Sequence, residues 1–138
     1  MDLSETYIRR AQERYGDRGE FHCSDVAMMP QQDAGSVDVA LAVGLLHHLD
    51  DSQVHALLDA VTRALHPGGR FISIDPCYDD NQSSIARFFI ARDRGLNVRT
   101  GQGYVALAQD RFGVASLTVR HDLTRIPYTH AILECVNS

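Results

Sequence analysis

The sequence has no tryptophan and only three cysteines in 138 residues. Cys23, Cys77 and Cys135 are odd in number and far apart, so they form neither a metal knuckle nor a disulfide framework. This usage fits a reducing compartment. No run approaches the roughly 18 apolar residues that span a bilayer, and the N-terminus lacks the basic and apolar parts of a signal peptide. We therefore expect a cytoplasmic protein with no membrane partner.

Positive charge is also scarce. Acidic residues outnumber basic ones by 18 to 13, for a formal net charge of −5. Nucleic-acid binding needs clustered positive charge, so we expect no nucleic-acid partner. We expect the arginines between residues 87 and 99 to lie on a solvated helix face. The length suits one domain, residues 1–138, with a single core.

The longest regular pattern is a strand, a helix and a second strand. Val37–Val43 is a nearly continuous apolar run, typical of a strand buried on both faces of a parallel sheet. Asp50 or Asp51 can cap the next helix, whose apolar residues share one stripe. That stripe consists of Val54, Leu57, Leu58, Val61 and Leu65. Pro67-Gly68-Gly69 ends the helix in a tight turn, residues 70–74 form the next strand, and these lengths predict a parallel crossover.

Weaker patterns flank this unit. Ser4 is expected to cap a helix that ends at Gly16, because apolar residues recur between them at helical spacing. Four further segments have regular patterns: helices at 85–90 and 104–112, and strands at 116–121 and 129–136. The last two are adjacent in the chain, which suggests an antiparallel hairpin at a sheet edge.

In chain order, these segments resemble the class I S-adenosylmethionine-dependent methyltransferases, especially those that act on small molecules. The matching segments are Asp2–Ala11, Phe21–Val26, Asp38–Asp51 with its Leu-His-His-Leu-Asp-Asp loop, and Leu65–Arg70 with its Pro-Gly-Gly turn. The resemblance is strong over residues 2–76 and extends to 114–136 by pattern only. It implies an α/β fold with a Rossmann-like open sheet, mostly parallel with an antiparallel C-terminal hairpin. Residues 1–76 would form the cofactor side, and 77–138 the acceptor side and edge strands.

One part of the family pattern is absent from the sequence. The family's first strand ends in a Gly-x-Gly-x-Gly loop, which lets the backbone approach the methionine part of the cofactor. Pro67-Gly68-Gly69 has the wrong place and spacing for that loop. We therefore expect an N-terminally truncated methyltransferase that lacks the first strand, the glycine loop, the first helix and most of the second strand. Two strand edges would then be exposed.

The resemblance also implies roles for acids that follow strands. Asp2, with Leu3, would accept hydrogen bonds from the cofactor's ribose hydroxyls, because a carboxylate can accept two at once. Asp25 would accept a hydrogen bond from the adenine amino group, and the Val26 N–H would meet the ring. The simpler interpretations are a mobile terminal residue at Asp2 and a turn or cap acid at Asp25.

The candidate catalytic residues are His47 and His48, after the strand Val37–Val43. Either can act as a general base or orient a substrate hydroxyl, since histidine titrates near neutral pH. The alternative is that one of them caps the strand end. Adjacent side chains point different ways, so no metal site is expected. Gly44 and Leu45 would approach the cofactor closely or form a simple turn, and Asp75 faces the substrate or merely ends its strand.

The second half of the chain is where this family places its acceptor-binding parts. Tyr104, Tyr128 and His130 are candidate substrate residues there, although each also suits the core or its rim. Arg94 and Arg99 are candidates for holding an anionic acceptor; the alternative is a solvated loop.

The resemblance implies methyl transfer from S-adenosylmethionine to a small-molecule acceptor, by in-line displacement between oriented reactants. The alternative is a non-catalytic remnant or subunit that binds no cofactor alone and pairs with a second copy or a complementing chain. A nicotinamide-dependent oxidoreductase would also need a glycine loop, and the rest of its pattern is missing.

Overall fold

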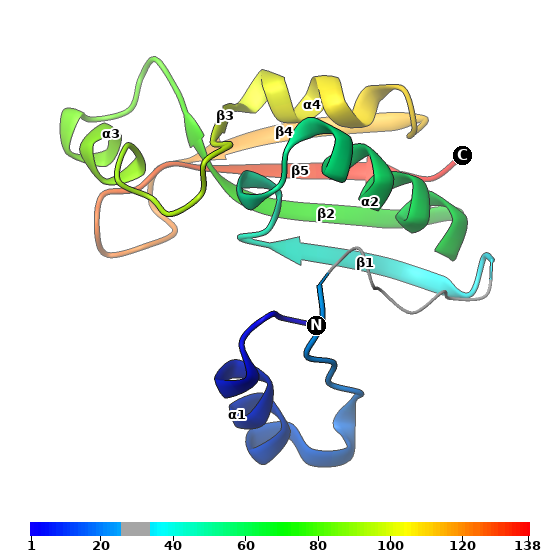
Figure 1. Ribbon diagram of the computed structural model, residues 1–138. Coiled ribbons are helices and arrows are strands. Elements are labelled where there is room, and N and C mark those ends of the chain that lie inside the picture. Colours follow the sequence, from blue (N-terminus) through cyan, green and yellow to red (C-terminus); the bar gives the residue numbers. More distant parts are fainter. Residues whose placement is uncertain (26–33) are drawn as a thin grey trace. The chain divides into compact units, whose positions relative to one another are not determined.

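The computed structural model describes residues 1–25 and 34–138 (Figure 1). The chain divides into two compact units, Met1–Gln31 and Gln32–Ser138. The expectation of one domain, with a cofactor side up to residue 76 and an acceptor side after it, stays a prediction. Val26, a candidate cofactor residue, lies outside the described residues.

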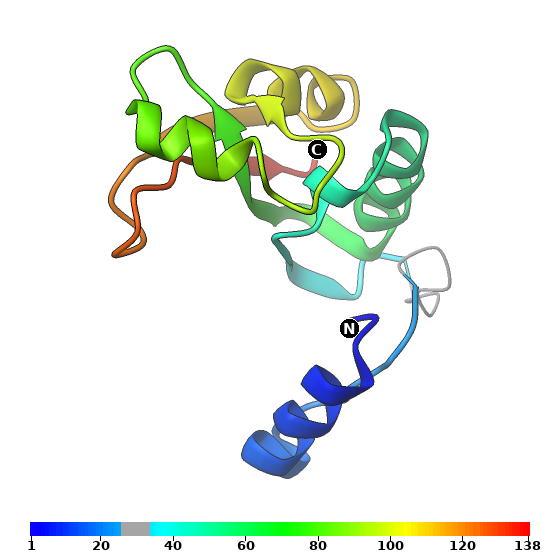
Figure 2. The ribbon, with the colours of Figure 1, turned by 60° about the vertical axis from the view of Figure 1, so that its left-hand side comes forward.

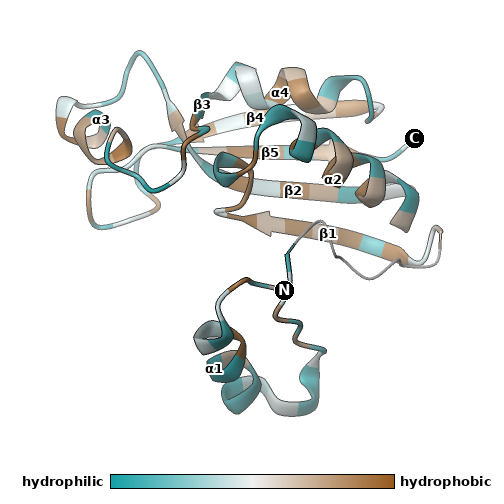
Figure 3. Ribbon diagram, viewed as in Figure 1, coloured by the Kyte–Doolittle hydropathy of each residue, from teal (hydrophilic) through white to brown (hydrophobic). Residues whose placement is uncertain are grey.

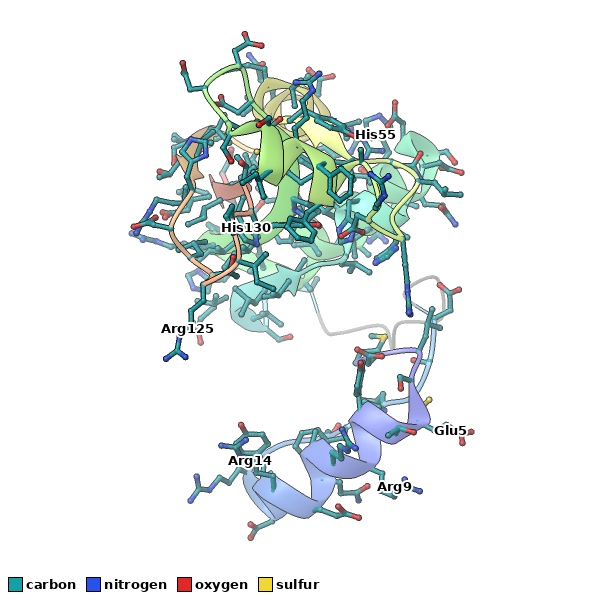
Figure 4. The ribbon with its side chains drawn as sticks, turned by 90° about the vertical axis from the view of Figure 1, so that its left-hand side faces the viewer. Glu5, Arg9, Arg14, His55, Arg125 and His130 are labelled. Carbon is teal, nitrogen blue, oxygen red and sulfur yellow. The ribbon has the colours of Figure 1, made fainter. Side chains whose placement is uncertain are left out.

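The first unit is built around α1 (Glu5–Tyr15). Ser4 caps this helix, because its Oγ accepts the Tyr7 N–H at 3.4 Å. Gly16 ends it with a φ of 55°, a conformation that favours glycine. The expected helix is thereby confirmed. None of its residues is buried, and its charged side chains project outward from the ribbon, as the labelled examples in Figure 4 show.

The second unit contains an open sheet in the order β1-β2-β5-β4, with β3 paired to β2 (Figure 1). Its strands are β1 (Val37–Val43), β2 (Leu65–Tyr78), β3 (Arg99–Thr100), β4 (Val114–Arg120) and β5 (His130–Val136). β1 and β3 run parallel to β2, while β5 is antiparallel to both β2 and β4. The expected α/β sheet with an antiparallel C-terminal hairpin is therefore confirmed.

Two helices, α2 (Asp51–Ala64) and α4 (Gly101–Gln109), lie beside each other against one face of this sheet (Figures 1 and 2). Asp50 starts α2 with a capping box, since its side chain accepts the Gln53 N–H while the Gln53 side chain accepts the Asp50 N–H. The apolar stripe of α2 is buried as predicted, with Val54 and Leu58 at most 1% exposed. A short helix, α3 (Ser84–Ile90), follows β2.

The prediction that β1 is buried on both faces is wrong for the second unit. Val39, Leu41 and Val43 are 54%, 64% and 62% exposed, whereas Ala42 on the other face is buried. The reason is that α2 and α4 cover only one face of the sheet. The uncovered side of β1 is therefore apolar, and most of this strand is brown in Figure 3.

The Pro67-Gly68-Gly69 segment does not separate α2 from β2. β2 begins at Leu65, and its pairing with β1 slips in register at this segment, as in a β-bulge. Gly68 adopts a φ of 83° and its N–H donates to the Asn137 carbonyl at 2.9 Å. The Asn137 side chain donates to the Leu65 carbonyl at 2.8 Å. The expected Pro-Gly-Gly turn is therefore part of β2, and this strand, Leu65–Tyr78, is longer than the predicted strand over residues 70–74.

Candidate active site at the strand ends

The loop after β1 turns sharply and presents two histidines. Gly44 has a φ of 62°, and its N–H donates to the Ile74 carbonyl at 2.8 Å, so the loop stays attached to β2. A single 3-10 turn, η3 (Leu46–His48), follows directly. The rings of His47 and His48 lie 4.0 Å apart between centroids, yet their surroundings differ completely: His47 is buried and His48 is exposed.

His47 is held between two carboxylates. Its Nδ1 lies 2.9 Å from Asp75 Oδ1, which also accepts the His47 backbone N–H at 3.2 Å. Its Nε2 lies 3.3 Å from Asp93 Oδ1. Both ring nitrogens can donate together only in the imidazolium form. The His47 carbonyl accepts the Asn97 N–H at 3.0 Å, so this residue joins the end of β2 to the loop that follows α3.

Asp75 lies at the centre of this arrangement and is 1% exposed. Its Oδ1 accepts both bonds from His47, while its Oδ2 has no partner among the described residues. Leaving a buried acceptor unsatisfied is costly, and more so for a charged group. The interaction with His47 is therefore the main compensation for burying this carboxylate.

Asp93 is the second carboxylate on His47, and its oxygens are occupied within the loop. One oxygen accepts the Gly95 N–H at 2.8 Å, and the other accepts the Tyr128 hydroxyl. Burial alone would raise the pKa of Asp93. The bonds from Tyr128 and Gly95, together with the imidazoles of His47 and His48, outweigh burial and leave this pKa below its ordinary value.

An open hollow of about 430 Å³ lies beside these residues. Its lining comes from η3, α3 and two loops: His47, His48, Phe89, Arg92, Asp93, Arg94 and Tyr128. Within this hollow His48 is an exposed imidazole next to a buried one. Tyr128 has a raised pKa, first because of burial and then because its hydroxyl bonds to the Asp93 carboxylate, so it remains a hydrogen-bond donor near neutral pH.

The three candidate substrate residues occupy different positions. Tyr128 lines the hollow. The His130 ring lies 5.2 Å from the Tyr128 ring, and burial lowers the pKa of His130 although Asp75 partly opposes this. Tyr104 does not line the hollow: it is 1% exposed and its hydroxyl donates to the Pro76 carbonyl at 2.9 Å. The structure therefore places Tyr104 in the core.

Arg99 has a structural position as well. Its guanidinium pairs with Asp51 at 2.6 Å and donates to the carbonyls of Leu46 and Leu49. It thus fastens the histidine loop to the start of α2, and it does not line the hollow.

Sequence reasoning missed Asp93, which lies in an irregular loop between two arginines and has no motif to distinguish it.

In the first unit, the segments that carry Asp2 and Asp25 run side by side. A parallel bridge joins Asp2 to Cys23, with the Asp2 N–H donating to the His22 carbonyl at 3.2 Å. Asp2 Oδ1 accepts the Ser4 N–H at 2.7 Å, and its second oxygen has no partner among the described residues. Leu3 is exposed, and its carbonyl accepts the Cys23 thiol at 3.5 Å.

An open sheet with polar side chains at the carboxyl ends of parallel strands defines a Rossmann-like α/β protein. A family model described as a methyltransferase domain matches residues 1–73, more than half of the chain. The chain therefore belongs to this family, within the class I S-adenosylmethionine-dependent methyltransferases, and the resemblance noted in the sequence is confirmed. The cofactor of this class is S-adenosylmethionine.

Solved methyltransferases share the fold at low sequence identity. A geranyl diphosphate methyltransferase in complex with S-adenosylmethionine gives a TM-score of 0.71 at 15% identity, covering 99% of this chain and 67% of that one. A Methanosarcina mazei S-adenosylmethionine-dependent methyltransferase gives 0.70 at 15%, covering 99% and 79%. The human N-acetylserotonin methyltransferase gives 0.67 at 17%, covering 99% of this chain and 39% of that enzyme.

The chain likewise spans 39% of the methyltransferase SibL, at a TM-score of 0.68 and 16% identity. No curated protein matches the sequence.

In the described parts of the chain, no helix is long and apolar enough to cross a membrane. Across residues 1–25 and 34–138, no group of three or more His, Cys, Asp and Glu side chains is arranged to hold a metal ion.

Two observations test whether these residues fit the cofactor. The second oxygen of Asp2 can accept a hydrogen bond from a hydroxyl such as that of a ribose. Gly44 exposes its backbone at the tip of β1, where a side chain is disfavoured by its φ of 62°. Each feature, taken by itself within its own unit, suits part of the cofactor, and Leu45 follows Gly44 in the loop.

Proposed function

We propose that this chain transfers a methyl group from S-adenosylmethionine to a small-molecule acceptor. Asp2, Leu3 and Asp25 of the first unit would hold the adenosyl part, and Gly44 and Leu45 are the candidate cofactor residues of the second unit. The observation that carries the proposal is the contrast between the adjacent histidines: one is fixed by carboxylates and the other opens into a hollow at the strand ends. His48 is thus the imidazole of the pair that a ligand in the hollow can reach.

S-adenosylmethionine supplies a methyl group on a sulfonium, which is already an activated leaving group. The residues of the chain therefore need mainly to orient the acceptor and exclude water. His48 can accept the proton of an acceptor hydroxyl or amine, since its ring is exposed and makes no hydrogen bond or ion pair with a carboxylate in the described part of the chain. Proton acceptance of this kind contributes about 10²- to 10⁴-fold to rates.

His47 acts as a positioning residue in this proposal. Both of its ring nitrogens face carboxylates and both of its backbone groups are bonded to other segments. These bonds fix the 3-10 turn from which the next residue, His48, projects. A displaced turn would move the proton acceptor relative to the hollow, and displacements of about 1 Å lower rates by about 10²-fold.

The test is isothermal titration of the 138-residue chain with S-adenosylmethionine. We expect measurable binding, weakened about tenfold or more by Asp2→Asn, because hydrogen bonds to charged groups contribute about 1.5–3 kcal/mol. Asp17→Asn is the matched control, since this exposed acid lies at the other end of α1. It should leave the affinity unchanged.

A folded chain that fails to bind S-adenosylmethionine would overturn the proposal. That result would support the alternative of a non-catalytic remnant or subunit, which pairs with a second copy or a complementing chain. Equal effects of Asp2→Asn and Asp17→Asn would show that Asp2 has no place at the adenosyl group, and would reject the assignment of that residue.

A further inference from the structure

The hollow beside His48 contains two guanidinium groups without a carboxylate. Arg94 makes no hydrogen bond or ion pair with any described residue. Arg92 lies over the Phe88 ring, with its guanidinium carbon 3.7 Å from the ring centroid, and likewise has no acidic partner in the described part of the chain. By contrast, Arg99, the first residue of β3, pairs with Asp51. The hollow therefore gathers positive charge in a chain of net charge −5.

The one acid of the hollow does not neutralise these arginines. Asp93 uses its two oxygens for His47, Gly95 and Tyr128. Its negative charge is thus directed toward a buried imidazole and two hydrogen-bond donors of the protein. Arg92 and Arg94 remain available for a ligand, and the fork of a guanidinium matches a carboxylate or phosphate in two-bond geometry.

The hollow also has an apolar wall. Phe89 on α3 lines it and is 40% exposed, which is a large aromatic surface to leave in water. Tyr128 adds a second ring to the lining. Aromatic walls with a few polar groups are typical of small-molecule sites. The combination fits a ligand with a flat apolar body and one anionic group.

We propose that this hollow is the acceptor subsite, and that it takes a small aromatic or apolar molecule with a carboxylate or phosphate group bound by Arg92 and Arg94. This inference rests on the proposed function, because it assigns the substrate class of the same site. His48 would then face the part of the acceptor that loses its proton. The sequence offered Arg94 and Arg99 as candidates for holding an anionic acceptor, beside the alternative of a solvated loop. We retain Arg94 and replace Arg99, which pairs with Asp51, by Arg92.

The test uses benzoate and phenyl phosphate as probes, with benzamide as the uncharged analogue of benzoate. Binding to the whole chain is followed by the NMR shift of the His48 ring protons. We expect at least one anionic probe to bind at least tenfold more tightly than benzamide. If benzoate is favoured, the anionic group is a carboxylate; if phenyl phosphate is favoured, it is a phosphate.

Arg94→Gln and Arg92→Gln should each weaken binding of the preferred anion at least fivefold. Arg125→Gln is the matched control, because it removes the same charge from a side chain that points away from the body of the second unit (Figure 4). Equal binding of benzamide and the anions would overturn the proposal, as would an equal effect of Arg125→Gln. No cofactor is present in this experiment, so its failure is distinct from failure to bind S-adenosylmethionine.

Discussion

Two consecutive histidines in this protein have opposite environments. The 3-10 turn at η3 sends His47 inward, between Asp75 and Asp93, while His48 remains at the surface of the hollow. The sequence alone leaves both as candidate bases, because adjacency does not decide which side chain is buried. The decision comes from two acids, 28 and 46 residues further along the chain, whose positions depend on the tertiary fold.

This difference predicts unequal effects on stability. His47→Leu removes the imidazole that compensates the buried Asp75 carboxylate, and breaking a buried pair in this way costs about 3–5 kcal/mol. His48→Leu changes an exposed side chain and should alter the free energy of unfolding by about 0.5 kcal/mol or less. Urea denaturation of both variants measures the two values. Similar losses would show that His47 is not the anchor described above.

At the scale of elements, short-range patterns predicted most of the second unit. The β1 strand has the predicted bounds, and the α2 stripe is buried because its spacing and its Asp50 cap are local properties of the sequence. Local patterns could not predict whether one face or both faces of a strand are covered in the sheet. An apolar run reads the same whether both faces are covered or one, so the exposed side of β1 was missed. The Asp93 loop has no periodic pattern, and its role depends on contacts with η3.

The short helix α3 matters to the candidate site because it carries Phe89. Ser83 caps it by accepting the Ala86 N–H at 3.1 Å. We expect Ser83→Ala to lower the free energy of unfolding by about 1 kcal/mol, as for other cap serines. Ser84→Ala is the matched control, one residue inside the helix, where the side chain makes no hydrogen bond to a described residue.

Chemical denaturation of the two serine variants, followed by circular dichroism, gives the comparison. The Ser83 variant should also weaken binding of the preferred anionic probe, since a frayed α3 no longer holds Phe89 at the hollow. An equal loss of stability in both variants would mean that the cap hydrogen bond does not stabilise α3.

At the scale of the whole molecule, the second unit is a half-covered sheet. Its core lies between the sheet and the two helices α2 and α4, where Leu58, Phe71 and Leu133 are each 1% exposed. Within the second unit, the apolar residues Val39, Leu41 and Val43 on the opposite side of β1 are exposed. Surfaces of this kind contribute little to folding, because their side chains do not leave water.

A pair of leucine substitutions measures this asymmetry. Leu58→Ala opens a cavity in the covered layer and should cost about 2–5 kcal/mol. Leu41→Ala removes a side chain that is 64% exposed, so only a loss of strand preference is expected, below about 1 kcal/mol. The free energies of unfolding of both variants are measured by urea denaturation at the same protein concentration. A cost at Leu41 that matches Leu58 would mean that the outer face of β1 is covered in solution, and repeating the measurement at a tenfold lower concentration would then show whether a second copy covers it.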